Sequence, residues 1–177
     1  MGEQQALCAG GGTLNPEGLR SKRSTRDAWA FPEGQVPISR DSAGASLERR
    51  GTVVGLMVLA KASPRLRMNY DLRNSDADQS QRMLNAIEPG SPLPIHRHRK
   101  TSETVVCLRG RLVWEFYEEL ERRCTERIEL SPNGRVVALN VPAGRWHTVR
   151  SLESGSVILE MKDGAYEPIG PEDILQM

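Results

Sequence analysis

The sequence predicts an all-β fold, a sandwich or barrel of short strands preceded by one helix. From about residue 66 onward, short runs rich in β-branched and aromatic residues recur at close intervals. The segments between them are turn material: "EPGSP", "RG", "SPNG", "PAG" and "ESGS". Glycine accepts a positive φ without steric cost, so such segments favour tight connections between strands. A chain of 177 residues is long enough for one domain of this kind.

The N-terminal part of the chain reads differently. Residues 1–37 are rich in Gly, Ser, Pro and charge and show no sustained period, so we expect a poorly ordered extension. A helix is predicted over about 41–62, where Asp41 or Ser42 can cap its start and Pro64 stops it. The resulting organisation is an extension (1–37), a single domain with a leading helix (38–168) and a C-terminal tail (169–177).

Eight strands are predicted within the domain, near 66–72, 82–88, 103–109, 111–117, 123–130, 136–141, 146–152 and 156–162. Alternation within 111–117 assigns one set of side chains to the core: Leu112, Trp114 and Phe116. The other set is expected to be more exposed: Val113, Glu115 and Tyr117. In the predicted strand 103–109, Cys107 is expected to fill the core rather than to act as a catalytic thiol.

Composition narrows the class of protein. The net charge is +1, from 24 basic and 23 acidic side chains, which favours neither nucleic acid nor a membrane surface as partner. Three cysteines without a CxxC spacing suit a reducing compartment. The longest apolar run, 53–60, is far below the roughly 20 residues of a membrane-spanning helix, and the N-terminus lacks signal-peptide features. We therefore expect a cytoplasmic protein whose partner is a small molecule or another protein, and we favour a small-molecule substrate or ligand.

The three histidines of the chain occupy two short segments. His96 and His98 are two residues apart, so a strand places both imidazoles on one face. Glu103 begins the next predicted strand and His147 begins a later one, and strand ends that converge in a closed sheet can bring all four together. Such a set suits one divalent ion, Fe(II), Mn(II), Ni(II) or Zn(II). An H-x-H pair alone is more often structural than a metal site, so the flanking residues decide.

Those flanking residues follow two longer patterns. The first, G-x5-H-x-H-x3–4-E-x6-G, is complete between Gly90 and Gly110. The second, G-x5-P-x-G-x2-H-x3-N, keeps its P-x-G-x2-H core at 142–147, but seven residues separate Gly134 from the proline and Ser151 replaces the asparagine. Both resemble the motifs of the cupin superfamily. The resemblance implies a jelly-roll-like double-stranded β-helix barrel, with a metal bound by His96, His98, Glu103 and His147.

A narrower resemblance covers about residues 38–168. The stretches "SPRLRMNYDLR", "QRMLNAIEPGS", "LRGRL" and "VPAGRWHTVRSLESGSVILEMKDGAYEP" look like the WbuC-type cupin-fold metalloproteins. These are small bacterial proteins often encoded with surface-polysaccharide (O-antigen) biosynthesis genes. The resemblance implies a metal-binding protein that acts on, or binds, a sugar or nucleotide-sugar. The first 37 residues and the tail "IGPEDILQM" depart from the pattern.

Several functions stay open at this point. A non-haem iron dioxygenase and a non-catalytic, metal-dependent binding module use the same ligand set, and fold alone does not decide between them. A homodimer is expected from the superfamily.

Four polar residues before the first motif are candidates for orienting a substrate: Arg67, Asn69, Arg82 and Asn85. Arginine binds carboxylate or phosphate with two parallel hydrogen bonds, and asparagine suits a hydroxyl-rich ligand. The alternative is that they form surface ion pairs and strand-edge hydrogen bonds. Glu160, amid apolar residues, is expected to pair with one of the arginines, because a buried carboxylate needs a partner.

Overall fold

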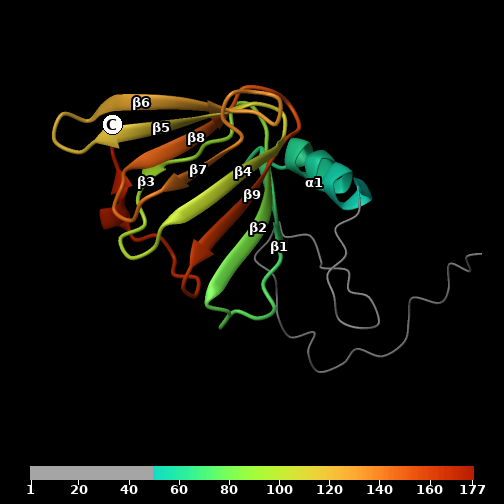
Figure 1. Ribbon diagram of the computed structural model, residues 1–177, viewed down its shortest axis with the longest axis horizontal. Helices are drawn as coiled ribbons and strands as arrows, with labels where there is room; N and C mark the ends of the chain where they lie inside the picture. The colour runs from blue at the N-terminus through green and yellow to red at the C-terminus, as the bar shows by residue number, and fades with distance from the viewer. Residues whose placement is uncertain (1–49) are drawn as a thin grey trace, which may run out of the picture. The chain divides into compact units, whose positions relative to one another are not determined.

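The computed structural model describes residues 50–177, which form two five-stranded antiparallel sheets and one α-helix (Figure 1). The first sheet has the order β1 (Arg67–Asp71), β2 (Ser80–Ile87), β9 (Ser156–Asp163), β4 (Glu103–Arg109) and β7 (Ala138–Val141). The second has the order β10 (Ile174–Leu175), β3 (Ile95–His96), β8 (His147–Ser151), β5 (Leu112–Glu118) and β6 (Arg123–Leu130). The helix α1 (Arg50–Ala62) comes first, and a short 3-10 turn (Pro171–Asp173) precedes β10.

The strand order is that of a jelly roll. Strands distant in sequence are neighbours: β9 pairs with both β2 and β4, and β8 pairs with both β3 and β5. The predicted fold class, an all-β jelly roll with a leading helix, is therefore confirmed. The expectations for residues 1–37 and for the start of the helix at 41–49 lie outside the described residues.

Two cores hold this arrangement together. Side chains from both sheets meet between them, among them Val105 and Ile158 from the first sheet and Trp114 and Val149 from the second. On the other face of the first sheet, α1 packs through residues such as Leu56 against β1, β2 and β9. Burying each large apolar side chain contributes roughly 1.5–3 kcal/mol. The part of the first sheet formed by β2 and β9 is thus packed on both faces, which disfavours a slip of its strand register.

The predicted core set of β5 is confirmed, whereas the set expected to be more exposed is wrong in part. Glu115 and Tyr117 are buried on the outer side of the second sheet. Arg127 and Arg150 each donate from Nε to Glu115 at 2.8 Å, and the Tyr117 hydroxyl donates to it at 3.0 Å. Long side chains of neighbouring strands therefore cover a carboxylate that simple alternation places in solvent.

In residues 50–177, no helix combines the length and the apolar character needed to cross a membrane.

Candidate metal centre

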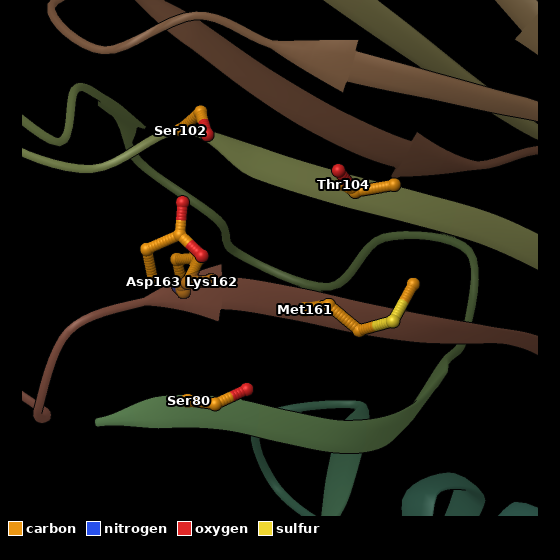
Figure 2. Close-up of a pocket in the computed structure, with 6 residues that line it drawn as sticks. All are labelled: Ser80, Ser102, Thr104, Met161, Lys162 and Asp163. Carbon is orange, nitrogen blue, oxygen red and sulfur yellow. The ribbon is translucent and has the colours of Figure 1, made fainter. Parts of the chain in front are cut away.

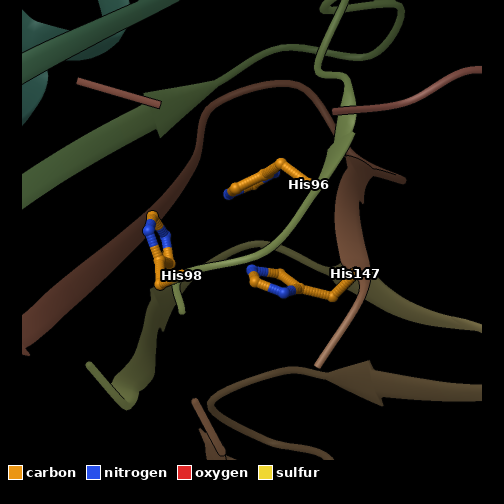
Figure 3. Close-up of side chains that lie close together, drawn as sticks. All are labelled: His96, His98 and His147. Carbon is orange, nitrogen blue, oxygen red and sulfur yellow. The ribbon is translucent and has the colours of Figure 1, made fainter. Parts of the chain in front are cut away.

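The three histidines come together at one end of the second sheet (Figure 3). His96 and His147 are directly paired across β3 and β8, and His98 follows β3 by two residues. One ring nitrogen from each histidine lies within 4.8 Å of one from each of the others. The prediction that distant histidines converge is thereby confirmed, and the group has the composition and spacing to hold a metal ion.

A single turn ties the two halves of the site together. Gly144, in the turn before β8, donates its backbone N–H to the carbonyl of His98 at 2.7 Å. Its φ is +79°, which other residues adopt only with strain, so this position favours glycine. The glycine of the second sequence motif therefore positions a histidine of the first.

The C-terminal segment contacts the strand and loop that carry His96 and His98. Strand β10 pairs with β3, with Ile174 opposite His96. Asp173 accepts hydrogen bonds from Nε of Arg97 at 2.9 Å and Nε of Arg99 at 2.5 Å. Arg97 also stacks over the ring of Trp146 at 4.3 Å. The segment from 169 onward had no predicted element, and yet it holds the strand that carries the first histidine.

Backbone carbonyls determine which nitrogen of two histidines faces the centre. Nδ1 of His96 lies 3.1 Å from the carbonyl of Pro94, and Nδ1 of His147 lies 2.8 Å from the carbonyl of Arg145. A carbonyl only accepts hydrogen bonds, so each Nδ1 carries the proton and each Nε2 keeps its lone pair. Nε2 of His147 is buried and has no hydrogen-bond partner among the described residues. This orphaned acceptor, beside two other imidazoles, fits a metal ligand whose second nitrogen is held by the protein.

Glu103, the first residue of β4, reaches the histidines from the opposite sheet. Its Oε2 lies 3.2 Å from Nε2 of His98 and 4.0 Å from Nε2 of His147. The carboxylate is almost fully buried. Glu103 thus borders two of the three histidines, and its carboxylate could supply negative charge to a divalent ion held there.

Lys162 also enters this cluster, which the sequence did not predict. Its Nζ lies 3.3 Å from Nε2 of His98, 3.6 Å from Glu103 and 2.6 Å from Glu160. Asn85 donates to the second oxygen of Glu160 at 2.8 Å. The expectation that Glu160 pairs with an arginine is wrong: a lysine two residues later on the same face of β9 takes that role.

Burial and neighbouring charges shift the pKa values at the site. Burial, followed by the charge of His147, lowers the pKa of His96 to about 4, and burial also lowers the pKa of His147. Although burial opposes it, contacts with His98 and Lys162 bring the pKa of Glu103 down to about 2. Burial also opposes the charged form of Lys162, but the carboxylates of Glu160 and Glu103 raise its pKa. At neutral pH the site therefore presents neutral His96 and His147, a carboxylate and an ammonium group.

Not all of the predicted substrate residues lie near this cluster. Asn69 and Asn85 face each other across β1 and β2, and Asn85 contacts Glu160. Arg82 lies on the opposite face of β2 from Asn85 and pairs with Asp78. Arg67 is paired with Ile87 of β2, and Lys162 is paired with Gln81 of the same strand. Ile87 and Gln81 are six residues apart, which is about 20 Å along a strand.

Arg67 donates instead to the carbonyl of Pro92 at 2.8 Å. The structure therefore brings Asn85, with Asn69 beside it, toward the histidines and leaves the two arginines away from them. A role of these four residues in substrate binding stays a prediction.

A depression on the first sheet lies on the other side from the histidines. It is lined by Ser80, Ser102, Thr104, Met161, Lys162 and Asp163 (Figure 2). Met161 and Thr104 are paired neighbours of β9 and β4, and their side chains alternate with those of Lys162 and Glu103, which face the histidines. None of the predicted metal ligands lines this depression, but Lys162, which contacts Glu103 and His98, does.

Comparisons with known proteins give the following similarities. A family model described as "Domain of unknown function (DUF6016)" matches residues 50–130. The search of curated proteins finds no match. Among solved structures, KdgF from Halomonas sp. is similar with a TM-score of 0.46 and 15% identity, covering 59% of this chain and 84% of that one.

Two further solved structures are similar at the same level. The capsular polysaccharide assembling protein CapF from Staphylococcus aureus has a TM-score of 0.47 and 19% identity, over 60% of this chain but only 28% of that one. The cupin domain of Cnp3 from Schizosaccharomyces pombe has a TM-score of 0.44 and 11% identity, over 56% of this chain and 65% of that one. The fold of residues 50–177, read from its own strand order and sequence motifs, is a cupin-type jelly roll.

Proposed function

We propose that the protein binds one divalent metal ion through His96, His98, His147 and Glu103, and uses it to act on or bind a small polar molecule. The observation that carries this proposal is the buried Nε2 of His147, which lacks a hydrogen-bond partner in the described chain and lies beside two other imidazoles. A buried acceptor without a partner destabilises a fold by about 1–3 kcal/mol unless something binds it. A metal ion supplies that partner.

The residues around the ligands define what the site offers. Three imidazoles and one carboxylate are a ligand set that suits Fe, Mn, Ni or Zn, and an ion held there would act as a Lewis acid. Phe116 is paired with His147, and the two ring centroids are 6.5 Å apart, so an apolar residue closes the site on the side of β5. The His98 side chain keeps 15% of its surface exposed, so solvent reaches one of the proposed ligands.

The substrate we propose is a sugar or nucleotide-sugar of bacterial surface-polysaccharide (O-antigen) biosynthesis. This finer proposal is supported by the WbuC-like stretches, one of which includes most of β2 and another the whole of β9.

Elemental analysis of the protein, purified without a histidine tag, tests the metal site. The expected result is about one equivalent of a divalent metal per chain in the wild type, and a clear loss of that metal in His98→Ala. Lys100→Met is the matched control, since Lys100 is close in sequence but its side chain is exposed and, within residues 50–177, pairs with Glu167. A wild-type protein that fails to retain metal after loading, or a His98→Ala variant that retains it equally, would refute the proposal.

A further inference from the structure

Lys162 is the one ammonium group among the described residues that lies within contact distance of the predicted ligands. Its side chain is 12% exposed, and it extends from β9 to His98, in the loop that follows β3 of the opposite sheet. An ammonium group carries three N–H donors. In the structure these face Glu160, Glu103 and His98.

A bound metal ion competes with Lys162 for two of these three contacts. Nε2 of His98 has one lone pair, so it cannot coordinate a metal and also accept a hydrogen bond from Lys162. The Glu103 oxygen that lies 3.6 Å from Lys162 is the same oxygen, Oε2, that faces His98 and His147. Metal binding therefore leaves Lys162 with Glu160 as its lasting partner and with at least one free donor directed at the centre.

The net charge of the site also changes when a metal ion binds. Glu160 compensates Lys162, and Glu103 compensates one of the two positive charges of a divalent ion. One positive charge then remains in a largely buried site. Charge that is removed from water and left unpaired is unfavourable, so the loaded site favours a ligand that brings one negative charge.

From this geometry we propose that Lys162 binds an anionic oxygen of the substrate, and that the substrate is a monoanion of the carboxylate class, such as an acidic sugar. The proposal rests on the proposed metal-dependent function and adds to it the charge of the ligand. Lys162 thereby becomes a specificity-determining residue, because a free donor beside the metal favours an acid over its neutral analogue. Asn85 acts behind it as a positioning residue, through its hydrogen bond to Glu160.

A matched pair of sugars tests the inference. D-glucuronate and D-glucose differ by a carboxylate in place of a hydroxymethyl group, and inorganic phosphate tests whether a dianion is preferred. Isothermal titration of each probe into the Zn(II)-loaded protein is expected to show binding of glucuronate at least tenfold tighter than binding of glucose. Equal binding of the two sugars, or a clear preference for phosphate, would overturn the inference.

The variant Lys162→Met separates an anion-binding role from a structural one. It is expected to weaken glucuronate binding at least tenfold, because a charge-assisted hydrogen bond is lost. It should leave Zn(II) affinity, measured by competition with a chelator, unchanged or higher, because it removes a positive charge from beside the metal. A lysine needed only for structure would weaken both, which would contradict the proposal, as would glucuronate binding that the variant leaves unchanged.

A second variant guards against misfolding. Lys162→Met leaves Glu160 buried without a cation, so the double variant Glu160→Gln/Lys162→Met removes that charge as well and keeps an amide oxygen for Asn85. It is expected to show the same split between glucuronate and Zn(II) affinity, and Lys100→Met should change neither. If the wild type takes up no Zn(II), the proposed function fails; if it takes up Zn(II) but Lys162→Met does not alter glucuronate binding, only the role of Lys162 fails.

Discussion

Acid is expected to destabilise the metal-free protein through His96. The pKa of this imidazole is lowered from 6.5 to about 4, first by burial and then by the charge of His147. Between these two values the unfolded chain binds a proton that the folded chain does not. Stability is therefore fully present above pH 6.5 and is lost progressively as the pH falls toward 4. A shift of one pKa unit corresponds to about 1.36 kcal/mol, so His96 alone accounts for a loss of about 3 kcal/mol by about pH 4.

Urea unfolding in the presence of a chelator measures this loss. The free energy of unfolding is compared at about pH 7.5 and about pH 4.5 for the wild type and for His96→Gln, whose side chain does not titrate. The pKa of Glu103 is held at about 2, so its own effect belongs to more acidic conditions than these. The pKa of His147 is lowered too, and that contribution remains in the variant. If wild type and His96→Gln lose equal stability between the two pH values, the reasoning is refuted.

Three further predictions follow from other parts of the fold. Gly110→Ala is expected to destabilise the protein more than Gly144→Ala in urea titrations. Both glycines have positive φ, but a Cβ at Gly110 would lie 2.3 Å from Oγ of Ser156, whereas a Cβ at Gly144 would meet nothing within 4 Å. Equal effects of the two substitutions would contradict this prediction. Trp114→Ala removes a side chain that is only 1% exposed, so it should lower the free energy of unfolding by about 3–5 kcal/mol. A loss below about 1 kcal/mol would be inconsistent with the described core. Zn(II) at about 100 times its dissociation constant should stabilise the wild type by about 2.7 kcal/mol and His147→Ala by far less, as read from thermal unfolding; equal stabilisation would count against the site.

Much of the strand pattern could be predicted because local turns delimit it. The predicted strands 103–109 and 123–130 coincide with β4 and β6. β3 and β10 were missed, since each has two residues and exists through its pairing with a distant partner, which no local pattern reports. Tertiary pairing thus decides the short elements, and one of these carries His96.

The candidate ligands were predictable for a different reason: fixed spacing and a shortage of histidine singled them out. Lys162 was missed although its position carried a signal, because Glu160 and Lys162 share a strand face by parity and a buried carboxylate needs a cation. Parity also separates Arg82 from Asn85, which are three residues apart on β2. Two interpretations could therefore have been corrected from the amino-acid sequence alone, by the alternation of faces along β2 and β9. One is the arginine partner of Glu160, and the other is the grouping of Arg82 with Asn85.

The candidate ligands are divided between the two layers of the fold. His96 and His147 belong to the second sheet, whereas Glu103 belongs to the first. An ion bound by all of them would link the two sheets. The sheets could not move apart at that end while every bond to the ion persisted. Opening of the sandwich at that end would therefore require at least one bond to the ion to break, so a bound ion is expected to slow the separation of the two layers.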